Sequence, residues 1–471
     1  MKKLLSLALV LVMVLSMFTM VACGPTEVDD GKIHVVFYHT MGANLRAVLD
    51  EYVKEFEALY PHIKIDHSQE GGYDDVRDKI KTELTVGNQP NMAYCYPDHV
   101  AMYNLSGMVE VLDNYINSTK EITRADGTTE ILGLTAEQIA DFIPGYYNEG
   151  KQFGDGLMYT LPMSKSTEVL YYNKTFFEEN NLSVPTTWDE MEALCEQILA
   201  IDPNCIPLGY DSESNWFITM CEQLGSPYTS AQAGNHFLFD NDTNKAFVKR
   251  FAEWHNKGYV TTQEIYGAYT SGLFVEQGVK EDGTPKQRSY MSIGSSAGAT
   301  HQRPEKVNGE YPFEVGIASI PQANADNKKV ISQGPSICMF YDADPAVMEA
   351  TWLFMKFLTT NVSFQAEFAE ASGYVPVLKS VANDPLYSAF LAKANGGQYI
   401  AALSAKVCLE QADYYYTSPA FNGSSDARDA VGGLLQAAMV ARKTTPEDQW
   451  NAYIDQLFAN YVADCKGAIG E

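Results

Sequence analysis

One stretch near the middle of the chain constrains the fold more than any other. It contains two predicted strands separated by a polar break, at 157–161, 164–167 and 169–172. A capping box of Thr187 and Glu190 then begins a helix, whose apolar residues have helical spacing: Met191, Leu194, Cys195 and Ile198. The order strand, polar crossing, strand and helix is typical of an α/β protein.

The residues ahead of this stretch predict how the chain enters it. Residues 138–149 are expected to be helical. Gly154-Asp155-Gly156 is a tight-turn sequence between two segments that can pair. We therefore expect a hairpin to lead into the first strand of the stretch.

A regular alternation of strands and helices comes earlier in the chain. Three predicted strands, joined by amphipathic helices, lie at 33–39, 62–67 and 92–96. This rhythm indicates an open parallel sheet, in which ligands bind at the carboxyl ends of the strands. Three loops fall at those ends: 38–42, 71–73 and 97–99.

The length and charge narrow the class of protein. The chain has 471 residues, which exceeds what one hydrophobic core usually serves, so two lobes are expected. Its formal net charge of −27 argues against nucleic acid as a partner, because nucleic acid requires a basic face. An acidic, solvated surface suits a soluble secreted protein.

Residues 1–22 have the form of a secretory signal peptide. Lys2 and Lys3 precede an apolar run that ends in small residues before Cys23. A cysteine at this place is similar to the lipobox of bacterial lipoproteins, so we expect Cys23 to carry a lipid and residues 23–30 to form a tether. The apolar run is close to membrane-spanning length, and an uncleaved anchor is the alternative.

The other cysteines do not indicate a metal site. Seven follow Cys23, with no C-x-x-C spacing and no accompanying histidine cluster, so we expect no metal and no cofactor. Cys195 and Cys205 could bridge across a helix end. An odd number of thiols with mostly apolar neighbours more often indicates buried free cysteines.

One motif suggests catalysis. Gly294-Ser295-Ser296-Ala297-Gly298 fits the G-x-S-x-G nucleophile elbow after a predicted strand, with Ser296 as nucleophile. In that fold the catalytic histidine comes late in the chain, and no histidine lies beyond His301. We therefore expect no enzyme activity and keep a secreted hydrolase as a distant alternative.

The wording of the central stretch is more specific than its pattern. Its LP-x(6)-VLYYNK-x(2)-F-x(4)-L-x(2)-P-x-TWDE sequence resembles the hinge-crossing segment of extracellular solute-binding proteins of family 1, the ligand receptors of ABC importers for sugars and glycerol phosphates. The resemblance extends from about residue 33 to the C-terminus. It implies a two-lobed α/β fold of the type II periplasmic-binding-protein kind, each lobe an open, mainly parallel sheet flanked by helices.

The resemblance also implies how the chain divides. The N-terminal lobe would comprise 31–165 and about 330–375, and the C-terminal lobe 166–329 and about 376–471. The three crossing segments that would form the hinge lie near Ser166, 330–334 and 374–377.

Within the family, the chain most resembles glycerol-3-phosphate-binding receptors. The matching positions give a predicted ligand site: Tyr38, His39, Tyr73, Asp98, Ser166, Ser295, Ser296, Gly334, Tyr374 and Arg428. The resemblance assigns a ligand hydrogen bond to Tyr73 and phosphate binding to Arg428. Trp216 could stack on a sugar ring or pack against a helix. Two departures concern phosphate: Asp98 is a shorter carboxylate than the family's acid, and Pro335 replaces a glycine whose N–H could donate.

The resemblance implies a lipid-anchored receptor on the outer face of the bacterial cell membrane. It would act as a monomer, close around its ligand by hinge motion and deliver it to ABC permease subunits. The leading ligand is glycerol 3-phosphate or a glycerophosphodiester, and a neutral oligosaccharide is the alternative. A receptor that feeds a sensor kinase is a further alternative.

Overall fold

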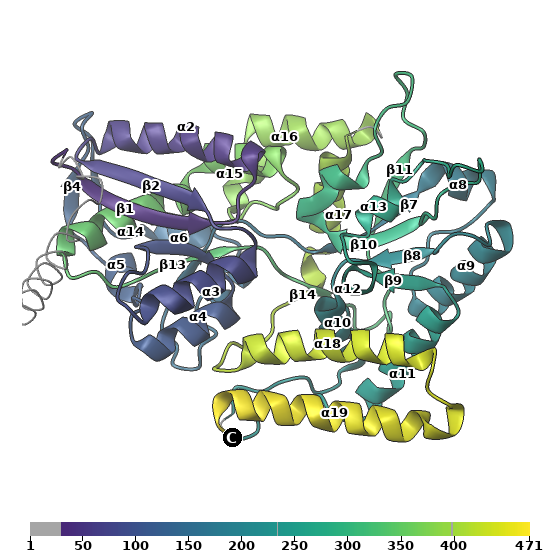
Figure 1. The fold of residues 1–471 in the computed structure, drawn as a ribbon. Helices are drawn as coiled ribbons and strands as arrows, with labels where there is room; N and C mark the ends of the chain where they lie inside the picture. Colours follow the sequence, from purple (N-terminus) through teal and green to yellow (C-terminus); the bar gives the residue numbers. More distant parts are fainter. Residues whose placement is uncertain (1–29, 233, 397–398) are drawn as a thin grey trace, which may run out of the picture.

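The computed structural model describes residues 30–232, 234–396 and 399–471; the predicted signal segment and Cys23 lie outside them. In this part of the chain two five-stranded sheets lie side by side, each covered by helices (Figure 1). Each sheet has its own hydrophobic cores. Among the described helices, none is both long and apolar enough to span a bilayer.

The first sheet collects strands from widely separated parts of the chain. Their order is β2 (Ile63–Gln69), β1 (Ile33–His39), β3 (Met92–Cys95), β13 (Ser336–Met339) and β6 (Thr160–Pro162). Strand β1 is parallel to β2 and β3, whereas β13 runs antiparallel to β3 and β6. Four of the five strands therefore point the same way, which confirms the expected mainly parallel sheet.

Helices cover both faces of the first sheet (Figure 1). Val35 and Phe37 are buried in the core shared with α2 (Ala43–Leu59), α14 (Pro345–Thr360) and α15 (Val362–Ala371). Ala93 and Cys95, on a neighbouring strand, are buried in the core shared with α3 (Tyr73–Leu84) and α4 (Pro97–Tyr103). The loops that enter α3 and α4 are the ones that follow β2 and β3.

The second sheet has the same plan. Its order is β11 (Val315–Ala318), β7 (Glu168–Asn173), β10 (Met291–Ser295), β8 (Leu208–Tyr210) and β9 (Val260–Thr262), and β7 is the strand that runs against its neighbours. The main helices of this lobe are α9 (Trp188–Ile201), α10 (Glu213–Leu224), α11 (Asp242–Asn256), α17 (Ile400–Glu410), α18 (Ser424–Arg442) and α19 (Glu447–Ile469).

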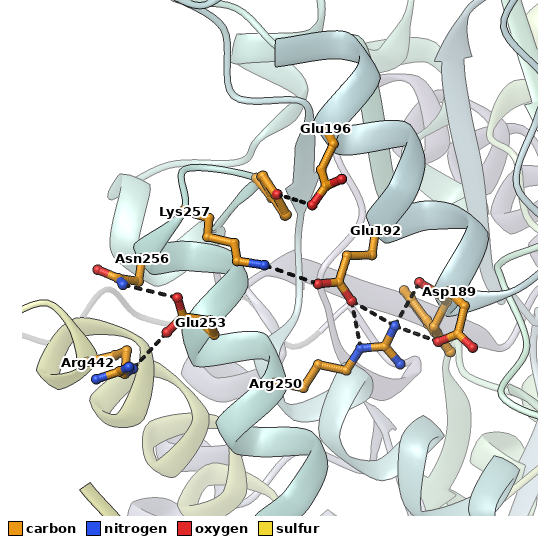
Figure 2. A network of polar contacts seen from close by, with 10 residues as sticks. Asp189, Glu192, Glu196, Arg250, Glu253, Asn256, Lys257 and Arg442 are labelled. Atoms are coloured by element: carbon orange, nitrogen blue, oxygen red, sulfur yellow. Dashed lines mark hydrogen bonds and ion pairs between the residues drawn. The ribbon is translucent and has the colours of Figure 1, made fainter. Parts of the chain in front are cut away.

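A surface network of charges holds the helices of the second lobe together (Figure 2). Arg250 on α11 donates to Asp189 and Glu192 on α9, at 2.6 and 2.9 Å. Arg442 on α18 donates to Glu253 on α11 at 2.8 Å. Helices that are far apart in sequence are thereby joined around the core, and Figure 2 shows Arg250 beside Asp189 and Glu192, and Arg442 beside Glu253.

The three segments that the sequence predicted as crossings meet between the lobes. Lys165 exchanges backbone hydrogen bonds with Val375 (3.0 and 2.5 Å), and Ser166 exchanges them with Gln333 (2.7 and 2.9 Å). The buried Lys165 ammonium also pairs with Glu149. The crossings are therefore paired to one another by short β-bridges.

The predicted hairpin at Gly154-Asp155-Gly156 is wrong. Residues ahead of this turn form the helix α7 (Pro144–Glu149), which buries Tyr146 and Tyr147, so no strand is left to pair across the turn. The strand after it, β6, is paired with β13 instead. The helical part of the prediction over 138–149 forms as two short helices, α6 (Ala136–Asp141) and α7.

The segment after the third crossing packs on the first lobe before it reaches the second. Val377, Val381 and Phe390 belong to the core of the first sheet, whereas Val407 and Cys408 belong to a core of the second. The sequence assigned this whole segment to the C-terminal lobe from about residue 376. We propose instead that the lobe boundary lies near residue 400.

The remaining described elements are short. They are α5 (Asp113–Ile116), β4 (Glu121–Thr123), β5 (Thr129–Ile131), α8 (Lys174–Glu179), α12 (Gln263–Tyr266), α13 (Ser271–Phe274), β12 (Val330–Ile331), α16 (Pro385–Ala392) and β14 (Tyr415–Tyr416). There are also 3₁₀ helices, at Asn104–Ser106, Ser296–Gln302, Lys379–Asn383, Lys393–Gly396 and Ala412–Tyr414. All seven described cysteines are buried and free, so Cys195 and Cys205 do not form a bridge.

Candidate ligand-binding cleft

A cleft of about 860 Å³ lies between the two lobes. The first lobe lines it with the loops that follow β2 and β3, and the second lobe with the segments that follow β8 and β10 and with the start of α18. Ser166, Gln333 and Tyr374 add the crossing segments. The cleft therefore lies at the carboxyl ends of strands in both sheets, as an open α/β sheet predicts.

The structure brings six of the predicted site residues to this cleft: Tyr73, Asp98, Ser166, Ser295, Tyr374 and Arg428. They come from both lobes and from two of the three crossings. Both lobes and the segments between them therefore contribute predicted residues to the cleft.

Tyrosines form one wall of the cleft. Tyr73 stacks on Tyr96, with 4.4 Å between ring centroids, and the hydroxyls of Tyr73 and Tyr374 are 3.1 Å apart. Burial raises the pKa of both Tyr73 and Tyr374, so both remain neutral phenols that can donate and accept hydrogen bonds. Tyr269 also lines the cleft and is 66% exposed. Stacked rings with polar tips suit the faces and hydroxyls of a sugar.

Arg428 is held by a polar network. Its guanidinium donates to Oδ1 of Asn215, and the Asn215 amide donates to Glu168 and to Gln333, both at 2.9 Å. Burial alone would lower the pKa of Arg428, but nearby negative charge, led by Asp98, raises it. Arg428 is therefore a fixed cation at the junction of the lobes.

Two carboxyl groups of the second lobe line the cleft near this network. Tyr210 donates to Glu168 at 2.6 Å, and the Thr270 hydroxyl donates to Asp211 at 2.7 Å. Burial raises the pKa of Glu168 to about 7, against lowering by its hydrogen bonds, and burial also raises the pKa of Asp211.

The structure does not bring the other predicted residues to the cleft: Tyr38, His39, Trp216, Ser296 and Gly334. Tyr38 lies beside α3, with the Lys79 ammonium 4.1 Å from its ring centre. His39 is buried against His67, with 3.0 Å between their ring nitrogens. Both side chains therefore contact other residues of the first lobe and do not line the cleft.

Trp216 is fully buried in the core of the second lobe. It stacks between Tyr210 and Phe251, at centroid distances of 4.6 and 4.0 Å. Of the two roles that the sequence left open, the structure matches helix packing.

Ser296 and Gly334 lie against the first crossing segment. Ser296 is fully buried, and its Oγ accepts a hydrogen bond from the Thr167 N–H at 3.2 Å. Gly334 has a φ of +98°, and a Cβ there would lie 2.7 Å from the Ser164 carbonyl oxygen. A buried serine that is bonded to the crossing segment does not resemble an exposed nucleophile.

Several residues of the cleft were not predicted: Tyr96, Glu168, Asp211, Asn215, Tyr269 and Gln302. Asp211 and Asn215 follow β8, which has only three residues and gives no alternating pattern. Tyr96 directly follows β3 and could have been found by applying the strand-end rule to every polar residue at that position.

Comparisons with known proteins agree with this architecture. The family model described as "Bacterial extracellular solute-binding protein" matches residues 51–395. The maltotriose-binding protein of Pyrococcus abyssi is 23% identical over 372 residues, covering 76% of this chain and 70% of the relative. The sn-glycerol-3-phosphate-binding periplasmic protein UgpB of Escherichia coli K12 is 23% identical over 360 residues, covering 74% of each.

Solved structures share the fold. UgpB from Mycobacterium tuberculosis in complex with glycerophosphocholine superposes with a TM-score of 0.69 at 16% identity, covering 93% of this chain and 98% of that one. The ABC substrate-binding protein Lmo0181 from Listeria monocytogenes in complex with cycloalternan gives 0.70 at 17% identity, covering 93% and 99%. The two-lobed fold, the cleft at the strand ends and the family match lead to one conclusion: this chain belongs to the bacterial extracellular solute-binding proteins.

Proposed function

We propose that this protein is the lipid-anchored substrate-binding component of an ABC importer, and that it captures a sugar, foremost an oligosaccharide, between its lobes. The observation that carries the proposal is the cleft itself, with its tyrosine wall on one side and polar side chains on the other. Such a site needs no covalent step, since aromatic faces and hydroxyl partners are enough to hold a sugar.

The charges of the cleft favour an uncharged sugar over a phosphate. Six carboxylates line it against two guanidinium groups. One of these, Arg77, is within ion-pair distance of Asp74, Asp78 and Asp429. These carboxylates would repel the negative charge of a phosphate. Sugar hydroxyls are neutral and can donate hydrogen bonds to the same carboxylates without repulsion.

A polyol phosphate, the ligand class that the sequence favoured, is the second candidate. Arg428 supports it, because its charged group lines the cleft and is bonded to a neutral amide rather than to a carboxylate. Its fork could accept a phosphate if Asn215 moved aside. Relatives of both kinds are known, since one binds maltotriose and another sn-glycerol 3-phosphate by name.

The rest of the proposal follows from the family and the N-terminal sequence. Members are extracellular proteins, which supports action outside the cytoplasm. A lipid on Cys23 would hold the protein at the outer face of the membrane, where the closed lobes present their ligand to permease subunits. The paired crossings near Ser166, Gln333 and Val375 would be the hinge for closure.

A binding experiment on matched variants tests the proposal. Purified protein is titrated calorimetrically with neutral oligosaccharides and with glycerol 3-phosphate. Tyr73→Ala removes part of the tyrosine wall and is expected to abolish measurable binding, whereas Tyr341→Ala, which removes an exposed tyrosine of the same lobe outside the cleft, leaves it unchanged. Equal affinity in both variants would contradict the proposed site.

A further inference from the structure

A second, smaller compartment lies beside the cleft. It has a volume of about 70 Å³ and is lined by residues of both lobes and of the crossing at 330–334. The cleft and the compartment share four lining residues, Tyr96, Asp98, Gln333 and Arg428, so these side chains stand where the two spaces meet. The volume is room for roughly five water molecules. The compartment therefore suits a small substituent of a ligand and not a further sugar ring.

Part of the wall of the compartment is apolar. Ile218 on α10, Tyr228 and Ile331 on β12 line it, and each is more than nine-tenths buried. Thr229 and Ser332 also line it, but their hydroxyl oxygens are buried and so are not offered to the space. A methyl group that displaced water from this wall would lower the free energy of the complex.

Two polar residues of the compartment are already bonded to the protein. Glu149 pairs with the buried Lys165 ammonium. The Thr417 hydroxyl accepts a hydrogen bond from the Gln152 amide at 2.7 Å. The hydrogen-bonding capacity of these two side chains is therefore largely used within the protein.

Asp98 and Arg428, in contrast, have unused hydrogen-bonding capacity. The Asp98 carboxylate makes no hydrogen bond and no ion pair within the described residues. The Arg428 guanidinium has several N–H groups, and in the same part of the chain it makes one side-chain hydrogen bond, to Asn215. Asp98 is the leading negative charge acting on Arg428, although no ion pair joins the two in the described structure. An acceptor and a donor group therefore stand near one another at the place where the cleft meets the compartment.

We propose that an amide group of the ligand binds between Asp98 and Arg428, so that the solute is an N-acetylated amino sugar. The amide N–H would donate to Asp98, its carbonyl oxygen would accept from Arg428, and its methyl group would enter the apolar part of the compartment. This inference rests on the proposed sugar-binding function and narrows its substrate class.

The opposite charges of Asp98 and Arg428 favour a neutral group between them. Arg428 would repel an ammonium group, and Asp98 would repel a carboxylate or a phosphate. A sugar hydroxyl can also donate and accept, but it has no apolar part to fill the compartment. An acetamido group combines a donor, an acceptor and a methyl group without net charge.

Matched sugars test the inference. Purified protein is titrated calorimetrically with glucose, glucosamine and N-acetylglucosamine, and with cellobiose and the N-acetylglucosamine dimer of the same linkage. In at least one of the two sets the acetamido sugar is expected to bind about tenfold more tightly than its neutral parent. Glucosamine is expected to bind no more tightly than glucose.

Two variants locate the acetamido group. Thr229→Leu enlarges a side chain that lines the compartment and not the cleft, and Asp98→Ala removes the acceptor. Each should reduce the preference for the acetamido sugar to about threefold or less. Because the preference is a ratio measured within one variant, a general loss of affinity does not change it. Thr243→Leu, the same substitution at an exposed position of α11 in the same lobe, is the control and should keep the preference.

Each outcome has a definite meaning. If the neutral parents bind as well as the acetamido sugars or better, the inference is wrong and the proposed sugar-binding function stands. If glucosamine gains as much as N-acetylglucosamine, the amine is recognised instead of the acetyl group, and the inference is again wrong. If no sugar binds, the proposed function fails together with the inference. A preference that survives both Thr229→Leu and Asp98→Ala would place the acetamido group elsewhere and overturn its assignment to this compartment.

Discussion

Arg77 on α3 and Asp429 on α18 form an ion pair across the mouth of the cleft, with 3.5 Å between Nη1 and Oδ2. The same nitrogen of Arg77 lies 3.3 Å from the Ser425 hydroxyl. Helix α3 belongs to the first lobe and α18 packs on the second. The two lobes are therefore joined at the mouth of the cleft by contacts between α3 and α18, in addition to the crossing segments.

Removing the Arg77–Asp429 ion pair should let the two lobes of the ligand-free protein separate more often. Arg77→Ala loses a partly exposed ion pair worth up to about 1 kcal/mol, so the balance between joined and separated lobes should shift by up to about fivefold. Small-angle scattering should show a larger radius of gyration. Lys79→Ala, which breaks a pair with Glu70 inside one lobe, is the control. Identical scattering from the parent, Arg77→Ala and Lys79→Ala would show that the Arg77–Asp429 ion pair does not affect the separation of the lobes.

The raised pKa of Glu168 should make the free energy of unfolding depend on pH. Its pKa is about 7 in the folded protein against 4.5 as the ordinary value, because it is buried. Between these values the folded state holds a proton that the unfolded state has lost, so stability falls as pH rises from about 4.5 to about 7, by roughly 3 kcal/mol in total.

Glu168→Gln should remove this decline. Urea unfolding at pH 5, 6, 7 and 8 measures it as the change in midpoint with pH, set against Glu121→Gln, which alters an exposed carboxylate on β4. A Glu168→Gln protein with the same slope as the parent would mean that the carboxyl group is already ionised at pH 5.

His39 should act in the opposite direction. The Met41 N–H donates to its Nδ1 at 3.1 Å, so the ring proton is on Nε2 and points to His67, which in turn is 2.9 Å from Asp50. Burial lowers the pKa of His39 to about 3. Below about pH 6.5 the imidazole of His39 is protonated in the unfolded state but not in the folded state. The free energy of unfolding therefore falls as the pH drops toward 3, by up to roughly 4 kcal/mol.

Unfolding midpoints between pH 7 and pH 4 test this direction. His39→Asn should be less stable than the parent at pH 7 and lose less on acidification. The exposed His34, whose pKa is raised by hydrogen bonds to Asp66 and Asp30, provides a control with the reverse sign. An unchanged acid slope in His39→Asn would assign acid sensitivity to other groups.

Trp216 should matter for stability and not for ligand contact. Trp216→Phe leaves a gap among Tyr210 and Phe251 and should cost about 1–3 kcal/mol. Thermal unfolding and a ligand titration on the same sample separate the two effects: the midpoint should fall and the affinity should stay within about twofold. A large loss of affinity with an unchanged midpoint would return Trp216 to the binding site.

The sequence predicted the parts of the fold that repeat or pair. The strand-end rule pointed to the loops that contain Tyr73 and Asp98, and the family resemblance gave Tyr73, Asp98, Ser166 and Tyr374 as ligand residues; all four line the cleft. The loops themselves are predictable, because a strand end or a polar break between strands is visible in a few consecutive residues.

Other parts of the site depend on contacts that local patterns do not contain. Asn215 and Trp216 are neighbours on one helix, yet one lines the cleft and the other is in the core, because successive helical residues face different directions. Ser296 sits in a hydrolase-like motif, but the crossing segment occupies its hydroxyl. The glycines at 154 and 156 turn the chain out of a helix, not out of a strand.

The most direct test of sugar binding in this cleft is a calorimetric titration of the purified protein with a panel of neutral oligosaccharides alongside glycerol 3-phosphate. Saturable binding of a sugar is expected, lost in Tyr73→Ala and kept in Tyr341→Ala. Binding of glycerol 3-phosphate alone, lost in Arg428→Ala, would contradict the sugar assignment and leave the acidic cleft with a phosphate ligand.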